Sequence, residues 1–147
     1  MCPELMTEPL NPSLAEGKTV TAIGPGMGTA PETIALVQGL FASLPKPMVV
    51  DADGLNCLAG SNWKAPEGAV RVLTPHPGEM SRLTGQTPEE LEARRIDTAH
   101  GWAMRWGVTL VLKGAPTVVA SPTGRVSVNP TGSAALATAG TGDVLAG

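Results

Sequence analysis

Hydrophobic residues in this chain recur in two patterns that alternate from one end to the other. Short apolar runs are separated by longer stretches in which apolar residues return every three or four positions, the spacing of one helix face. The short runs predict four strands, at residues 19–23, 48–51, 70–73 and 108–112. Two further runs, 117–120 and 125–129, flank a Ser-Pro-Thr-Gly turn and predict a hairpin at a sheet edge.

Helix signals lie between these runs. Thr29 and Glu32 have the spacing of a capping box in front of an amphipathic stretch that Pro45 ends. Short helices are expected after residue 51 and between residues 77 and 85. Thr87, followed by a proline and two glutamates, predicts the start of a longer helix that stops at residue 107. Its inward-facing residues are expected to be Leu91, Ile96, Ala99, Ala103 and Trp106.

The order of these elements predicts an α/β fold. Strands that alternate with helices indicate a mostly parallel sheet with right-handed crossovers and helices on both faces, hence three layers α/β/α, with an antiparallel edge hairpin. No linker divides the chain, so residues 1–147 are expected to belong to one domain. Ligands of such sheets bind outside the carboxyl ends of the strands. Five loops are therefore expected at one edge: 24–28, 51–56, 74–79, 113–117 and 140–143.

The composition of the chain argues against some classes of binding partner. The 147 residues carry a formal net charge of −3 and no basic stripe, which argues against a nucleic-acid or anionic membrane surface. Only 3% of the residues are aromatic, so the core must be mainly aliphatic. Cys2 and Cys57 are the only cysteines and lack metal-ligand spacing, which fits a reducing compartment. With neither a signal-peptide pattern nor a membrane-spanning run, the sequence predicts a cytoplasmic protein.

The most informative chemistry lies at residues 140–143. Gly140, Thr141 and Gly142 precede an apolar run that resembles a helix start, where unpaired backbone N–H groups and the helix dipole attract an anion. A carboxylate beside such a nest repels the anion, so Asp143 makes sense as a base that takes a proton from an attacking hydroxyl. The alternative is a glycine-rich turn that Asp143 caps, without a ligand.

The first two of the other loops each allow a functional and a structural interpretation. The glycines of residues 24–28 either let the backbone approach a ligand or simply turn the chain between strand and helix. Asp51 and Asp53 either hydrogen-bond to ligand hydroxyls or cap the following turn, and we expect a mixture of the two.

The same holds for the next two loops. Glu79 either holds a magnesium-bound water or is a favourable charge at a helix N-terminus, and His76 either contacts substrate or is a surface residue. Lys113 either reaches a nucleotide phosphate or marks the exit of a strand into solvent. Taken together, the five loops predict a phosphoryl-transfer site that uses a nucleotide.

Five motifs, taken in order, resemble those of the ADP-dependent NAD(P)H-hydrate dehydratases, a branch of the ribokinase-like superfamily. They are IGPGMG at 23–28, VDADGLN at 50–56, LTPHPGE at 73–79, LKGA at 112–115 with Thr117, and GTGDVLAG at 140–147. The resemblance covers the chain from Pro3 onward. It implies a ribokinase-like fold and a lyase that repairs damaged cofactor: ADP phosphorylates the ring hydroxyl of the S-hydrate, and elimination of phosphate restores NAD(P)H and leaves AMP.

The resemblance also implies a role for each matching residue. Asp143 corresponds to the base and contacts substrate, and Gly28, Asp53 and His76 lie at substrate-binding positions. Glu79 lies where kinase relatives keep a magnesium-linked glutamate, so Mg²⁺ is expected through water. The anion hole matches Gly140, Thr141 and Gly142, and the adenine-nucleotide positions match Lys113, Gly114, Ala115, Pro116, Thr117 and Gly142. ADP is the expected nucleotide, with ATP as the alternative, and a homo-oligomer is expected for the full-length protein.

Two departures from the family pattern shape the expectations. Many relatives read Gly-Asn-Pro-Gly where this chain has Gly132 to Ala135. The segment from Pro3 to Met6 resembles an internal stretch of the family domain, and the terminal motif stops early in its helix. The chain is therefore expected to be a partial domain without the first strands and the last helices. A small-molecule kinase of the same superfamily and a non-catalytic nucleotide-binding fragment are the alternative functions.

Overall fold

A computed structural model describes residues 16–131, and the regular elements within them follow the predicted order. The parallel part of the sheet comprises β1 (Thr21–Ile23), β2 (Met48–Val50), β3 (Arg71–Leu73) and β4 (Thr109–Leu112). The hairpin strands are β5 (Thr117–Ala120) and β6 (Val126–Asn129). The helices are α1 (Pro31–Ser43), α2 (Ala52–Leu58), α3 (Pro77–Thr84), α4 (Pro88–Ala93) and α5 (Arg95–Trp106).

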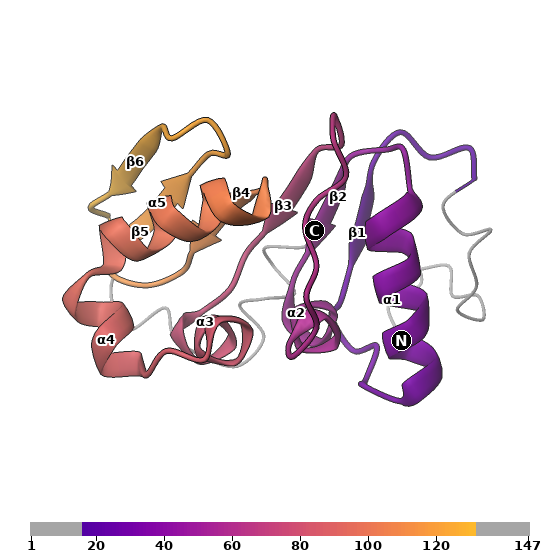
Figure 1. Ribbon diagram of the computed structural model, residues 1–147, viewed down its shortest axis with the longest axis horizontal. Helices are drawn as coiled ribbons and strands as arrows, with labels where there is room; N and C mark the ends of the chain where they lie inside the picture. The colour runs from indigo at the N-terminus through magenta and orange to yellow at the C-terminus, as the bar shows by residue number, and fades with distance from the viewer. Residues whose placement is uncertain (1–15, 132–147) are drawn as a thin grey trace.

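The six strands form one sheet in the order β1-β2-β3-β4-β5-β6. Strands β1 to β4 are parallel, and β5 and β6 join them antiparallel, which confirms the mostly parallel sheet with an edge hairpin. The carboxyl ends of β1 to β4 point to the edge where α2 and α3 lie, at the bottom of Figure 1. Because β5 runs the opposite way, its first residue, Thr117, starts at that same edge.

Within residues 16–131 the helices cover one face of the sheet (Figure 1). This follows from the strand order, because right-handed crossovers between consecutive parallel neighbours all pass over the same face. Side chains toward the helices are fully buried, whereas alternate side chains such as Val49, Val72 and Val111 are only half-buried. The second helical layer expected of a three-layer fold is not among the described residues.

The core is aliphatic, as expected, with one aromatic cluster at its margin. Phe41, Trp63, Trp106 and Trp102 form a chain of ring contacts with centroids 4.6–5.0 Å apart. A buried arginine, Arg71 on β3, donates hydrogen bonds to the carbonyls of Phe41, Leu44 and Lys46. It thereby satisfies carbonyl groups at the C-terminal end of α1, where no helical N–H follows. Burial lowers the pKa of the Arg71 guanidinium from its ordinary value.

Two local predictions for the helices are wrong. The cap of α1 is Ala30 rather than Thr29, and it makes no side-chain hydrogen bond, because Pro31 already opens the helix. The long helix expected after residue 87 is divided into α4 and α5 by Arg94, whose backbone is not helical (φ −133°, ψ 38°). Of the residues expected to face inward, Leu91, Ala99, Ala103 and Trp106 are buried, but Ile96 is 50% exposed and its neighbour Arg95 is buried instead. No helix in the described part of the chain is long and apolar enough to cross a membrane.

Candidate functional site

Four of the five loops singled out in the sequence lie at the carboxyl edge of the sheet. Residues 24–28 follow β1, 51–56 follow β2, 74–79 follow β3, and 113–117 connect β4 to β5. The parallel pairing of β1 to β4 places these exits side by side. The fifth loop lies outside the described residues, so the structure does not describe Gly140, Thr141, Gly142 or Asp143. The chain leaves β6 at the same edge, because Asn129 pairs with Thr117.

The glycine loop after β1 fits tightly against the start of α2. Gly24 has φ +132°, and a Cβ there would overlap the carbonyl oxygen of Asp51. The amide N–H of Gly28 donates a 2.8 Å hydrogen bond to Oδ2 of Asp53. Two predicted substrate-binding residues are therefore in direct contact. Behind them, burial and the nearby charge of Asp53 raise the pKa of the Cys57 thiol.

Lys113 joins the exits of three strands. Its ammonium lies 2.8 Å from Oδ1 of Asp51, after β2, and 3.8 Å from Oε2 of Glu79, after β3. Both carboxylate side chains are only 7% exposed, and that of Lys113 is 27% exposed. Buried charges need partners of opposite charge, and the two carboxylates and the ammonium of Lys113 provide these for one another. A lysine engaged in this way is a structural bridge between loops as well as a candidate phosphate contact.

His76 is the N-cap of α3. Its Nδ1 accepts hydrogen bonds from the amides of Gly78 (3.0 Å) and Glu79 (3.4 Å), and the Glu79 carboxylate accepts one from the His76 amide (2.8 Å). This is a reciprocal capping box with histidine in place of the usual serine or threonine. Nδ1 must be unprotonated to accept these bonds, so the proton of a neutral ring is on Nε2. The side chain remains 51% exposed, and this leaves room for a contact with a ligand.

The loop between β4 and β5 is held from several sides. The Lys113 amide donates to the carbonyl of Pro75 (2.8 Å), and the Thr117 hydroxyl donates to the carbonyl of Gly114 (2.9 Å). Arg95, on α5, donates to the carbonyls of Lys113 (3.1 Å) and Pro116 (3.3 Å). Sequence reasoning missed Arg95. The signal was an arginine four residues after Leu91 and four before Ala99, on a helix face that is otherwise apolar.

The arrangement of the described residues favours a magnesium ion bound through water over one that the side chains coordinate directly. Among residues 16–131 no three His, Cys, Asp or Glu side chains are grouped so as to hold a metal. The ammonium of Lys113 already faces both Asp51 and Glu79, which disfavours direct coordination there. A carboxylate has about four lone-pair positions, so Glu79 can still accept a hydrogen bond from a metal-bound water. The water-mediated contact stays a prediction.

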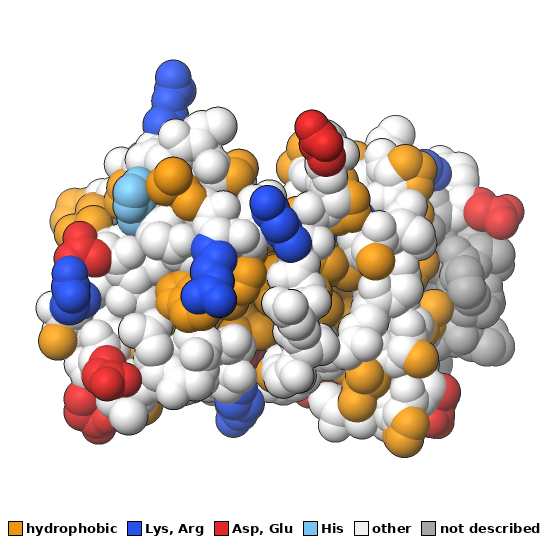
Figure 2. All heavy atoms as spheres, in the orientation of Figure 1, with side chains coloured by type: hydrophobic (Ala, Val, Ile, Leu, Met, Phe, Trp, Pro, Cys, Tyr) orange, Lys and Arg blue, Asp and Glu red, His pale blue; other side chains and the backbone are white. Residues whose placement is uncertain are grey.

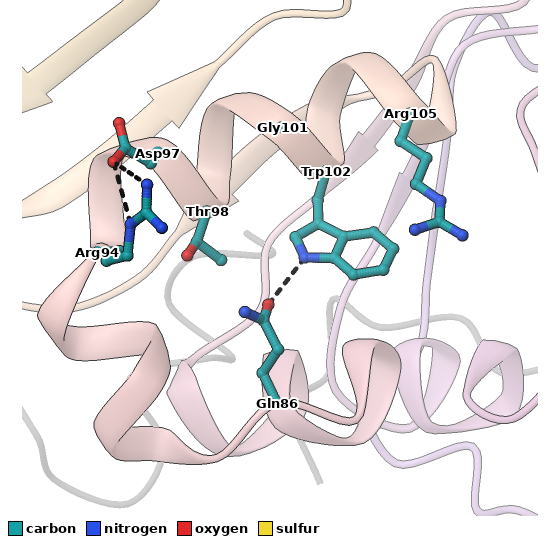
Figure 3. A pocket seen from close by; sticks show the side chains of 7 residues that line it. All are labelled: Gln86, Arg94, Asp97, Thr98, Gly101, Trp102 and Arg105. Carbon is teal, nitrogen blue, oxygen red and sulfur yellow. Dashed lines mark hydrogen bonds and ion pairs between the residues drawn. The ribbon is translucent and has the colours of Figure 1, made fainter.

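A shallow hollow of about 390 Å³ lies on the helical side, away from the strand exits. Gln86, Arg94, Asp97, Trp102 and Arg105 are among the residues that line it (Figure 3). Figure 2 shows basic side chains above apolar atoms near the middle of this face. None of the predicted site residues lines this hollow. The candidate site is therefore the carboxyl edge of the sheet.

The mostly parallel sheet, with its glycine- and carboxylate-bearing loops at the carboxyl edge, defines the class of the protein: it is a ribokinase-like α/β protein. Solved structures support this. The NAD(P)H-hydrate dehydratase of Bacillus subtilis, crystallised with ATP and Mg²⁺, superimposes with a TM-score of 0.75 at 39% identity, over 86% of this chain and 44% of that one. A ribokinase-like superfamily protein of Enterococcus faecalis gives a TM-score of 0.72 at 26% identity, over 87% of this chain and 44% of that one.

Sequence comparison gives the family itself. The profile of the NAD(P)H-hydrate dehydratase family matches residues 1–147, and the chain belongs to this family. It is 47% identical to the bifunctional NAD(P)H-hydrate repair enzyme of Thermofilum pendens, over 91% of this chain and 26% of that protein. It is 39% identical to the ADP-dependent (S)-NAD(P)H-hydrate dehydratase of Neisseria meningitidis, over 99% of this chain and 51% of that protein. The chain thus spans between a quarter and a half of the length of these relatives.

Proposed function

We propose that this chain forms part of a site that dehydrates the S-epimer of NAD(P)H hydrate, with ADP as the co-substrate. The observation that carries the proposal is the convergence of Gly28, Asp53, His76 and the 113–117 loop at one sheet edge. These are the positions that match the family motifs, and they follow four different strands, β1 to β4. Family membership supports the proposed reaction, and the convergence of these residues supports its proposed location.

The substrate is proposed to lie over the exits of β1 to β3. The Asp53 carboxylate holds the Gly28 amide and keeps the glycine loop close to the start of α2. Because that loop has no side chain at Gly26 or Gly28, a flat nicotinamide ring can approach its backbone. His76 contributes the exposed edge of its imidazole, whose orientation the capping box restrains.

The chemical step is assigned to Asp143, which lies outside the described residues. Its carboxylate accepts the proton of the ring hydroxyl, and the amides of Gly140, Thr141 and Gly142 stabilise the transferring phosphoryl group. ADP, when bound, supplies that group; ATP is the alternative nucleotide. The 113–117 loop is proposed to hold the adenine nucleotide, and Glu79 a magnesium-bound water. Elimination of phosphate, together with loss of a proton from the adjacent ring carbon, then yields NAD(P)H.

The test is a turnover assay with S-NADHX, ADP and Mg²⁺. We expect NADH absorbance to return with equimolar AMP and phosphate. Asp143→Asn is expected to lower kcat by about 10²–10⁴-fold, the usual contribution of a positioned base. Asp97→Asn, an exposed carboxylate paired with Arg94, is the matched control and should leave kcat unchanged. Equal rates for wild type and Asp143→Asn would remove Asp143 from its role.

The same experiment separates the alternative functions. A small-molecule kinase would leave a stable phosphorylated alcohol and no NADH. A non-catalytic nucleotide-binding fragment would show a thermal shift with ADP and Mg²⁺ but no turnover, because a ligand stabilises the state that it binds. A cytoplasmic location belongs to the same proposal, since its substrates are soluble nucleotides. The homo-oligomeric full-length protein stays a prediction.

A further inference from the structure

The inference rests on the proposed function and concerns Arg95, the buried first residue of α5, which no motif includes. Its side chain is 8% exposed, and its guanidinium is placed between two groups of acceptors. On one side Nη2 and Nε contact a single oxygen of Glu92, at 2.7 Å and 3.1 Å. On the other side Nη1 faces the carbonyls of Leu112 (3.5 Å), Lys113 (3.1 Å) and Pro116 (3.3 Å).

We propose that Arg95 is a positioning residue, which holds the 113–117 loop in the conformation that binds the adenine nucleotide. The argument begins with peptide geometry. The carbonyl and the following N–H of a trans peptide point in opposite directions. Because the Lys113 carbonyl points at Arg95, the Gly114 amide N–H points away from it. That amide has no hydrogen-bond acceptor among residues 16–131, and Gly114 is exposed.

The close packing of Gly114 against the guanidinium supports the same conclusion. Gly114 has φ +150°, and a Cβ there would lie 2.5 Å from Nη1 and 2.8 Å from Cζ of Arg95. Real Cβ atoms do not approach this closely, so a side chain at position 114 would displace the Arg95 guanidinium from the position in which it contacts the carbonyls. The arginine and the glycine therefore act together: one fixes the carbonyls inward, and the other permits the close approach that this needs.

A planar guanidinium suits this task better than an ammonium. It carries five N–H donors in a fixed fork, so it can bind a carboxylate and several carbonyls at once. Glu92 compensates its charge and is itself 58% exposed. The loop is thus anchored to α5, which packs against β4 and β5. Without this anchor the 113–117 loop still has, within residues 16–131, the Pro75 and Thr117 hydrogen bonds and the ion pairs of Lys113 with Asp51 and Glu79.

The test compares wild type with Arg95→Met, Arg95→Lys and a neighbouring control, Arg94→Met. Arg94 forms an exposed ion pair with Asp97, as Figure 3 shows, so its loss is expected to change little. For ADP binding, measured by calorimetry with Mg²⁺, we expect Kd to rise about 10- to 100-fold in Arg95→Met, as for loss of charged hydrogen bonds. Arg95→Lys should recover part of this loss. KM for the hydrate should stay within about twofold, because the hydrogen bonds and ion pair of Arg95 go to Glu92 and to the 112–116 carbonyls rather than to loops 24–28 and 74–79.

A second measurement does not depend on ligand. Amide hydrogen exchange in the peptide that covers residues 112–118 should be about tenfold faster in Arg95→Met than in wild type, with the peptides of β1 and β2 unchanged. If Arg95→Met does not fold, Arg95→Lys and Glu92→Gln decide by the same two readouts. Wild-type ADP binding with no effect of Arg95→Met overturns the inference and leaves the proposed function standing. Failure of the wild type to bind ADP overturns the proposed function itself. Unchanged exchange at 112–118 also overturns the inference.

Discussion

Gly24 offers the sharpest test of how the candidate site is assembled. Its φ of +132° is closed to residues with a side chain, and an added Cβ would overlap the Asp51 carbonyl oxygen and lie 2.7 Å from the carbonyl carbon. Both of those atoms belong to backbone at the end of β2, which cannot rotate away like the tip of a long side chain. Gly24→Ala must therefore separate the 24–28 loop from the start of α2.

The magnitude can be worked from two contributions. An alanine in a glycine-only backbone region costs about 1–3 kcal/mol. Forcing an extra carbon into a closed contact costs about 1–3 kcal/mol more, because neighbouring backbone must shift. The sum, about 2–6 kcal/mol, is a large part of the ~5–15 kcal/mol that stabilises an ordinary domain. Gly26→Ala is the matched control: its φ is +70°, and no atom lies within 4 Å of the added Cβ. That change should cost only about 1–2 kcal/mol of left-handed strain.

The assay is urea unfolding followed by tryptophan fluorescence, at constant protein concentration. With a denaturant slope of about 1.5 kcal/mol/M, Gly24→Ala should lower the midpoint by about 1.3–4 M, and Gly26→Ala by about 0.7–1.3 M. The reasoning is refuted if the two variants lose the same stability, because the contact with Asp51 would then contribute nothing. It is also refuted if Gly24→Ala unfolds at the wild-type midpoint.

Two further predictions concern groups behind the loops. Asp51→Asn and Lys113→Met should each lower the free energy of unfolding in urea by about 1–3 kcal/mol, which is less than for a fully buried pair because Lys113 is 27% exposed. The double variant should lose less stability than the sum of the two single variants. Simple additivity would contradict an ion pair between the two side chains. Because the pKa of Cys57 is raised in the folded state, the unfolded chain loses the thiol proton at a lower pH than the folded chain does. The free energy of unfolding should therefore fall as pH rises above about 8.5. Cys57→Ala should remove that part of the pH dependence. A Cys57→Ala profile that falls as steeply as wild type over this range would show that the thiol stays unperturbed.

Much of the local structure could be predicted because it depends on nearby residues. The period of apolar positions is enough to place β2, β3 and β4, and Thr87 with Glu90 forms the capping box expected of it. The predicted N-cap of α1 was wrong because Pro31 occupies the first helical position, which makes Ala30 rather than Thr29 the cap. The prediction for Ile96 was wrong because the buried face passes through Leu91, Arg95 and Ala99 at steps of four, and Ile96 lies one position beyond that face.

For the candidate site, too, some features could be predicted from the sequence and others could not. The sequence by itself determined which loops carry chemistry, since glycines and carboxylates directly after apolar runs are visible in one dimension. Which of these groups meet was decided only by the tertiary structure. Lys113 pairs with Asp51, 62 residues earlier, because β2 and β4 flank β3 in one parallel sheet. Arg95 reaches the 113–117 loop because α5 packs over β4 and β5. Strand order and helix phase set these distances, and both depend on the packing of the whole core rather than on any local pattern.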